Sequence, residues 1–254
     1  MDDMYQAFAE VYDLFMEDVP YDRWAKEIIG LLKEEGIDDG LVCELGCGTG
    51  QMTRRLAAAG YDMTGIDASF DMLMKAREYE AEGILYLEQD MREFELYGTM
   101  AAIVSVCDSM NYLTDDGDME KVFSLVKNYL DPGGIFIFDV NTVYKYENIL
   151  GEQIITDNRE EGSFIWENYY DRQKRINEYE LTLFIRDRQL SGENGEDLYK
   201  KYEETHFQRA YGIDEITEKV NESGLILKKV LDTDTMQTPS NTSERVCFVI
   251  QKGV

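Results

Sequence analysis

The stretch over residues 42–50, Val-Cys-Glu-Leu-Gly-Cys-Gly-Thr-Gly, constrains the fold of this chain more than any other. The apolar run over 41–45 is typical of a buried parallel strand, and Gln51 follows within a segment that predicts a helix over 50–59. Glycines at a strand-to-helix turn let the backbone adopt positive φ and let a ligand approach the main chain. The free N–H groups of the helix face the same place. The stretch therefore predicts a cofactor-binding turn, with a tight turn that binds nothing as the alternative.

The spacing of the glycines separates the classes of nucleotide cofactor. Gly46, Gly48 and Gly50 give G-x-G-x-G, whereas a dinucleotide fingerprint is G-x-G-x-x-G, and its third glycine would fall at Gln51. No Lys-Ser or Lys-Thr follows, so the turn is not a P-loop. Glu44, two residues before the first glycine, is unsuited to a phosphate and suits a ligand with an amino group. This spacing disfavours an NAD-dependent oxidoreductase.

The next predicted strand ends on an acidic residue. The segment 61–67 reads as a strand, and Asp67 lies about 20 residues after the glycines, where doubly wound folds place the carboxylate that holds ribose hydroxyls. The E-L-G-C-G-T-G turn followed by G-I-D-A-S resembles motif I and its successor in class I S-adenosylmethionine (SAM)-dependent methyltransferases. The resemblance implies a Rossmann-like α/β fold with a seven-stranded sheet, parallel except for its last strand, and SAM as cofactor with S-adenosylhomocysteine (SAH) as product.

The rest of the chain fits this pattern and adds an insertion. Strands and helices continue to alternate up to about residue 150, which predicts a parallel sheet with right-handed crossovers. From about 152 to 208 the apolar residues instead recur at period two, which predicts three or four antiparallel strands. The remaining predictions are helices over 70–79, 118–130 and 213–223, strands over 84–89, 100–107, 135–140, 225–231 and 246–251, and a turn over 131–134. We expect a SAM-binding core over 1–150 and 207–254, and an inserted antiparallel β subdomain on the acceptor side over 151–206.

Residues before the first strand are rich in aromatic side chains. The stretch 5–16 is amphipathic, and a second helix is predicted from about residue 18 to 32. Tyr5 and Tyr12 could serve an N-terminal helical lid that closes over a bound cofactor, since tyrosine joins an apolar ring to a polar tip. The alternative is that these rings only pack on the sheet.

Composition limits the partners and the setting. The formal charge of −27, from 52 acidic and 25 basic residues, disfavours a nucleic-acid substrate, because phosphate binding depends on Lys and Arg. No apolar run approaches 18 residues and no signal peptide is visible, so we expect no membrane association. Cys43, Cys47, Cys107 and Cys247 form no C-x-x-C pair, and there is one histidine, which predicts no metal site and a reduced, cytoplasmic setting. We expect a monomer or homodimer.

Four further stretches make the resemblance closer. They are Tyr12–Met16, Pro20–Trp24, Cys107–Leu113 and Glu204–Tyr211, and they are similar to the YqeM-type methyltransferases of bacteria over essentially the whole chain. The resemblance implies no particular methyl acceptor.

The resemblance implies a set of cofactor contacts at the carboxyl ends of the strands. Backbone around Gly46, Cys47 and Gly48 would approach the methionine and ribose groups, and Asp67 would accept from both ribose hydroxyls. Asp90 would meet the adenine amino group, with an ordinary helix cap as its alternative role. The remaining expected contacts are Tyr5 and Tyr12 at the carboxylate, Glu44 at the amino group, Met91 on the adenine ring, Cys107 and Asp108 at the methionine moiety, and Ala68 and Met72 elsewhere on the cofactor.

Absent motifs narrow the acceptor. No Asp or Asn precedes Pro-Pro and an aromatic after the fourth strand, and no Pro-Cys dipeptide occurs, which disfavours methylation of nucleobases. We therefore expect methyl transfer to N, O or C of a small molecule. His206 is a candidate general base, or alternatively a structural strand residue, and Asn111, Tyr112 and Arg209 are candidate acceptor contacts. The alternative to an enzyme is a protein that binds SAM or SAH without turning it over.

Overall fold

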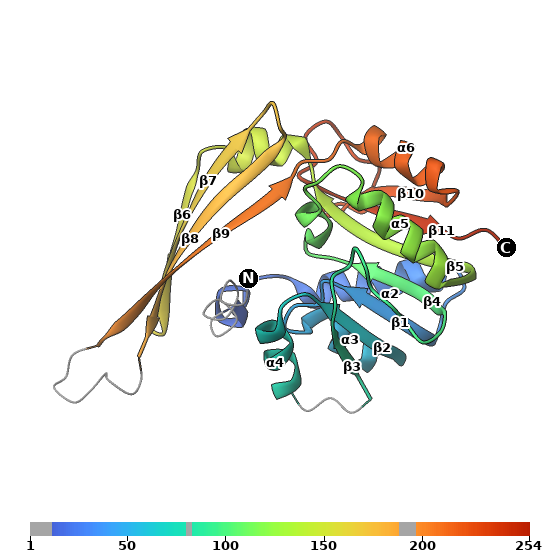
Figure 1. Ribbon diagram of the computed structural model, residues 1–254, viewed down its shortest axis with the longest axis horizontal. Helices are drawn as coiled ribbons and strands as arrows, with labels where there is room; N and C mark the ends of the chain where they lie inside the picture. Colours follow the sequence, from blue (N-terminus) through green and yellow to red (C-terminus); the bar gives the residue numbers. More distant parts are fainter. Residues whose placement is uncertain (1–11, 80–82, 188–196) are drawn as a thin grey trace.

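The computed structural model describes residues 12–79, 83–187 and 197–254. They form two sheets: a seven-stranded sheet in the order β10-β11-β5-β4-β1-β2-β3 and a separate four-stranded sheet in the order β6-β7-β8-β9. In Figure 1 the four-stranded sheet is long and twisted and extends away from the larger sheet. The fold predicted from the sequence, a mainly parallel sheet with an antiparallel insertion, is confirmed.

Six of the seven strands of the larger sheet run in the same direction, and β11 runs antiparallel to both of its neighbours, β5 and β10. Its strands are β1 (Gly40–Leu45), β2 (Tyr61–Asp67), β3 (Leu85–Glu88), β4 (Met100–Ser105), β5 (Leu130–Asn141), β10 (Ile226–Asp232) and β11 (Arg245–Gln251).

Helices cover both faces of this sheet (Figure 1). They are α2 (Tyr21–Glu34), α3 (Gln51–Ala58), α4 (Phe70–Glu78), α5 (Asp118–Tyr129) and α6 (Ile213–Ser223). Apolar side chains of α2 and α3 pack on one face and those of α5 and α6 on the other, so each face has its own buried cluster. None of the helices in the described segments combines the length and apolar character that crossing a bilayer requires.

The inserted sheet has four antiparallel strands, the upper of the two numbers expected. They are β6 (Ile154–Asn158), β7 (Gly162–Asp171), β8 (Ile176–Arg186) and β9 (Tyr199–Arg209). Alternate residues of β8 and β9 are buried, which matches the period-two pattern. A short π-helix, η2 (Lys145–Leu150), connects β5 to this sheet.

Two strand boundaries differ from the sequence-based expectation. The fourth strand was expected to reach residue 107, but β4 stops at Ser105 because Cys107 and Asp108 adopt φ of 60° and 53°. β5 begins at Leu130, five residues before the expected start, and includes the four residues predicted as a turn. Those residues bulge between the paired positions Met100↔Leu130 and Ala102↔Ile135, so the turn lies inside the strand.

Candidate functional site

The glycine turn after β1 is tied to the end of β2. Gly46 and Cys47 N–H groups donate to the Ile66 carbonyl at 2.8 and 2.9 Å. Gly46 has φ of 70°, and a Cβ there would lie 2.6 Å from Ser109 Oγ. Gly48 has φ of 52°, and a Cβ there would meet nothing within 4 Å. The backbone at Gly48 therefore borders open space in a conformation that glycine favours, which fits the close approach of a nucleoside.

Asp67, at the carboxyl end of β2, joins this turn. Its Oδ2 accepts from Gly48 N–H at 2.7 Å and its Oδ1 from Ser69 N–H at 2.8 Å. Burial raises the pKa of Asp67, and these backbone hydrogen bonds oppose the rise. Because a carboxylate has about four acceptor positions, both oxygens can still accept from two ribose hydroxyls, which is the role expected of Asp67. Ala68 beside it is exposed.

Glu44 lies beneath the turn. Its side chain is buried and accepts from the Thr53 hydroxyl of α3. Burial raises the pKa of Glu44 to about 8, with the Thr53 hydrogen bond acting in the opposite direction. The raised pKa favours the protonated form of Glu44, whereas a nearby ammonium group would favour its ionisation. Its expected contact with the amino group of SAM stays a prediction.

The segment after β3 brings Met91 to the turn but engages Asp90 elsewhere. Met91 Cε would lie 3.4 Å from a Cβ on Gly46. The Asp90 carboxylate accepts from Arg92 Nε at 2.9 Å and from Arg92 N–H at 2.8 Å. Although burial raises the pKa of Asp90, these Arg92 contacts lower it below its usual value overall. The hydrogen bond to the Arg92 backbone lies in a turn, and no helix begins in the described segment between β3 and β4. The helix cap expected as the alternative role of Asp90 is therefore wrong, and its contact with adenine stays a prediction. Met72 is buried in α4.

The loop after β4 is held by a buried carboxylate of β5. Cys107 and Asp108 N–H groups donate to the Asp139 carboxylate at 3.2 and 2.7 Å. Burial raises the pKa of Asp139. Asp108 itself pairs with Arg245 Nη2 at 2.6 Å and accepts from Gln208 Nε2, on β9, at 2.8 Å. These hydrogen bonds join the two sheets at the end of β4.

The N-terminal residues that are described lie over the glycine turn. Asp13 accepts from the Thr49 hydroxyl at 2.7 Å, from Gln51 Nε2 at 3.0 Å and from the Tyr79 hydroxyl at 2.8 Å. Tyr12 is hydrogen-bonded to Tyr21, and burial raises the pKa of its phenol. The Asp13 contacts were not foreseen, although Tyr12 and Asp13 form part of a recognised stretch. Tyr5 lies outside the described residues.

The candidate acceptor contacts divide into two groups. Tyr112 and His206 come together, with the Tyr112 hydroxyl 3.4 Å from His206 Nδ1. Asn111 is fully buried and bonded through its amide to the backbone of Asn141 and Arg209. The Arg209 guanidinium pairs with Asp116 at 2.8 Å and with Glu215 at 3.3 Å. Asn111 and Arg209 thus hold structural contacts in this form of the protein.

Two residues next to His206 were missed by the sequence reasoning. His206 Nε2 lies 3.2 Å from Glu204 Oε2, and the His206 ring stacks on Tyr179 at a centroid distance of 4.8 Å. The Glu-x-His spacing on a strand places both side chains on one face, and this signal could have identified Glu204.

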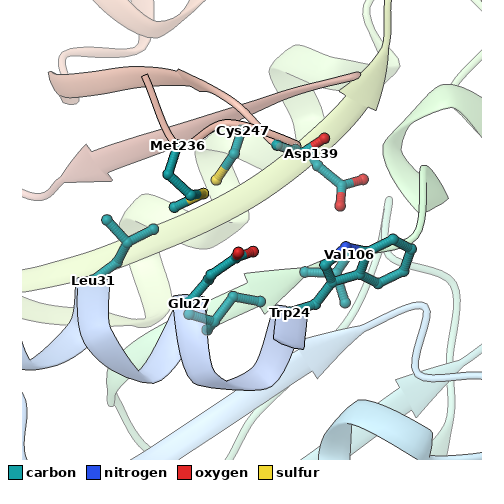
Figure 2. Close-up of a pocket in the computed structure, with 9 residues that line it drawn as sticks. Trp24, Glu27, Leu31, Val106, Asp139, Met236 and Cys247 are labelled. Carbon is teal, nitrogen blue, oxygen red and sulfur yellow. The ribbon is translucent and has the colours of Figure 1, made fainter. Parts of the chain in front are cut away.

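A pocket lies on the α2 face of the larger sheet. Its lining includes Trp24 and Glu27 of α2, Asp139 of β5 and Met236. Figure 2 shows the Glu27 and Asp139 carboxylates directed into this space. Asp139 therefore borders both the pocket and the loop after β4.

Comparisons with known proteins agree with this geometry. A family model described as "Methyltransferase domain" matches residues 42–134. The chain is 36% identical over 253 residues to a Bacillus subtilis protein named "Putative methyltransferase YqeM", covering 98% of each chain. It is similar to a crystal structure of an S-adenosylmethionine-dependent methyltransferase from Clostridium acetobutylicum, with 29% identity, a TM-score of 0.84 and coverage of 98% and 99%.

A third similarity covers about half of each chain. It is to a Streptomyces venezuelae enzyme named dTDP-3-amino-3,4,6-trideoxy-alpha-D-glucopyranose N,N-dimethyltransferase, with 29% identity over 133 residues, 52% of this chain and 56% of the enzyme. The full-length similarity to the Bacillus protein decides the family. The chain belongs to the S-adenosylmethionine-dependent methyltransferases, whose cofactor is SAM.

Proposed function

We propose that this methyltransferase transfers the methyl group of SAM to the nitrogen of a small amine. The amine would bind between the carboxyl ends of the parallel strands and the face of the inserted sheet that carries Glu204, His206 and Gln208. One observation carries the proposal. The Ser109 hydroxyl donates to the Gly46 carbonyl at 3.3 Å, and the adjacent Asp108 accepts from Gln208 of β9 at 2.8 Å. The glycine turn and the inserted sheet are therefore connected through a single short loop.

The residues around the turn fit SAM. Open space in front of Gly48 suits the nucleoside, and the Asp67 carboxylate lies beside it for the ribose hydroxyls. The thioether of Met91 packs near Gly46 and offers an apolar surface for the adenine. Bound SAM supplies an electrophilic methyl group on a sulfonium. The protein's own task is to orient the acceptor, exclude water and remove a proton.

An amine is the acceptor that the lining favours. Glu204 is a carboxylate near the join of the two sheets, and the aromatic rings of Tyr112, Tyr179 and Trp166 lie on the same side. Carboxylates and aromatic faces both attract an ammonium group. The name of the Streptomyces relative, a dimethyltransferase of an amino sugar, supports nitrogen as the methylated atom.

We propose further that the chain divides as its sequence predicts. Residues 1–150 and 207–254 would form the SAM-binding core with an N-terminal lid, and 151–206 the acceptor side. The Asp13 contacts to Thr49 and Gln51 support the lid. All four cysteines are free thiols, which supports a cytoplasmic location.

The test uses matched pairs of amines and alcohols. Purified protein is incubated with methyl-labelled SAM and either glucosamine or glucose, and either tyramine or tyrosol, and labelled product and SAH are measured. We expect label in the amine of a pair and none in the alcohol. Label in the alcohols would contradict nitrogen as the acceptor atom. Tight SAM binding by calorimetry with no SAH formed from any pair would favour a binding protein without turnover.

A further inference from the structure

We infer that Glu204, His206 and Tyr112 form a proton relay that removes a proton from the acceptor amine, an inference that rests on the proposed function. Tyr112 would contact the amine and His206 would receive the proton. Glu204 and Tyr179 would act as positioning residues. An alkylammonium group has no lone pair, so it must lose a proton before it can accept a methyl group.

The distances form a continuous path from solvent to a buried carboxylate. The Tyr112 hydroxyl lies 2.5 Å from the Tyr179 hydroxyl and 3.4 Å from His206 Nδ1. On the other side of the ring, His206 Nε2 lies 3.2 Å from Glu204 Oε2. Tyr112 is 36% exposed, whereas His206 and Glu204 are 3% and 5% exposed. The exposed end of the path is therefore the tyrosine.

Glu204 determines which nitrogen of His206 carries the proton. A carboxylate accepts hydrogen bonds only, so the neutral imidazole must present its N–H at Nε2. Nδ1 is then left as an acceptor facing Tyr112. Within the described residues Glu204 Oε1 is buried and has no hydrogen-bond partner. A carboxylate in that position stabilises an imidazolium formed beside it.

The groups that face His206 come from three elements. Glu204 precedes it on β9, Tyr179 stacks on its ring from β8, and Tyr112 approaches from the 3₁₀ turn η1 (Ser109–Tyr112). Trp166 of β7 packs on the far side of Tyr179 at 5.1 Å between centroids. Among the described residues that these contacts bring to His206, Glu204 is the one charged group.

These contacts allow two coupled proton transfers. The ammonium gives a proton to Tyr112 Oη while the Tyr112 proton moves to His206 Nδ1. The products are a neutral amine with a free lone pair and an imidazolium paired with the Glu204 carboxylate. His206 returns the proton to water after the methylated amine leaves.

The single histidine makes the arrangement measurable without an identified acceptor. Protein labelled with ¹⁵N-histidine gives one pair of ring nitrogens, whose chemical shifts report the tautomer. We expect the Nε2–H tautomer in the wild type, both free and with SAH. In Glu204→Gln the new amide can donate to Nε2, so we expect the Nδ1–H tautomer to increase.

A matched control and a second variant make the test decisive. Glu203→Gln changes the neighbouring glutamate, whose side chain is exposed and pairs with Lys201, and it should keep the wild-type tautomer. Tyr112→Phe removes one partly exposed hydroxyl, so it tests the relay if Glu204→Gln does not fold. With the most active amine of the matched pairs, Glu204→Gln and Tyr112→Phe should each lower kcat about 100-fold, leave the Kd of SAH unchanged and displace the pH profile.

The outcomes separate the relay from the proposed function. An Nδ1–H tautomer in the wild type, or wild-type kcat and pH profile in both variants, would overturn the relay. If the wild-type protein has the Nε2–H tautomer but methylates only the alcohols, the amine acceptor is overturned. The need for a proton acceptor then falls with it, whereas the Glu204–His206 pairing stands.

Discussion

At the scale of single residues, Asp67 should decide the affinity for the cofactor. Asp67→Ala removes a charged acceptor from two ribose hydroxyls, and a hydrogen bond to a charged group contributes about 1.5–3 kcal/mol. We therefore expect the Kd of SAM to rise at least tenfold in calorimetry. Asp62→Ala, an exposed residue of the same strand, is the control and should bind normally. Equal affinity of both variants would contradict the assignment of Asp67.

Glu44 gives the protein a pH-dependent stability. Burial in the folded protein raises the pKa of Glu44 to about 8 from its ordinary value of 4.5. Between these pH values the folded state binds more protons than the unfolded state, so the free energy of unfolding falls as pH rises. Glu44→Gln should reduce this fall by roughly 1–3 kcal/mol, at about 1.4 kcal/mol for each pKa unit.

Denaturant unfolding of wild type and Glu44→Gln at pH 5 and pH 8 measures the effect. Glu78→Gln, at an exposed position of α4, should match the wild type at both values. A fall in stability that is just as large in Glu44→Gln would show that Glu44 is already ionised in the folded protein at pH 5 and would contradict the raised pKa.

At the scale of elements, the N-terminal segment over residues 12–19 connects the glycine turn to the inserted sheet. Asp13 binds residues of the turn, and Phe15 packs edge-on against Phe164 of β7 at 4.9 Å between centroids. Arg159 pairs with Glu17 and Asp18 at 3.2 and 3.0 Å. These contacts place one short segment against both parts of the molecule, as a lid would require.

Hydrogen exchange tests the lid. Amides over 12–20 should exchange more slowly when SAH is added, and by a larger factor than amides of α5, because the cofactor would lie beneath this segment. Asp13→Ala should weaken the protection over 12–20 by removing contacts with Thr49, Gln51 and Tyr79. Protection that SAH leaves unchanged would mean that the segment only packs on the sheet.

The parts of the site that depend on spacing along the chain could be predicted from the sequence. The G-x-G-x-G turn and Asp67 follow from local spacing, and the structure brings Gly48 and Asp67 into hydrogen-bond contact. The early end of β4 depends on Asp139, a residue 31 positions after Asp108 that binds its backbone. Contacts of that kind, including Asp13 over the turn and Tyr112 beside His206, arise only when distant segments meet.

At the scale of the whole molecule, charge should govern stability. The formal charge of −27 produces mutual repulsion in the compact state, which salt screens. The melting temperature should therefore rise by several degrees as NaCl increases from about 10 to 300 mM. Sucrose at matched water activity is the uncharged control. A melting temperature that falls with NaCl would show that specific ion pairs outweigh the repulsion.

The central claim is that an amine is methylated where the inserted sheet meets the loop after β4. The most direct measurement is a crystal structure with SAH and the most active amine of the matched pairs. We predict that the amine nitrogen lies within hydrogen-bond distance of Tyr112 Oη and next to the SAH sulfur, on the side of Asp108 and His206. An amine bound instead in the pocket lined by Trp24, Glu27 and Asp139 would contradict the account.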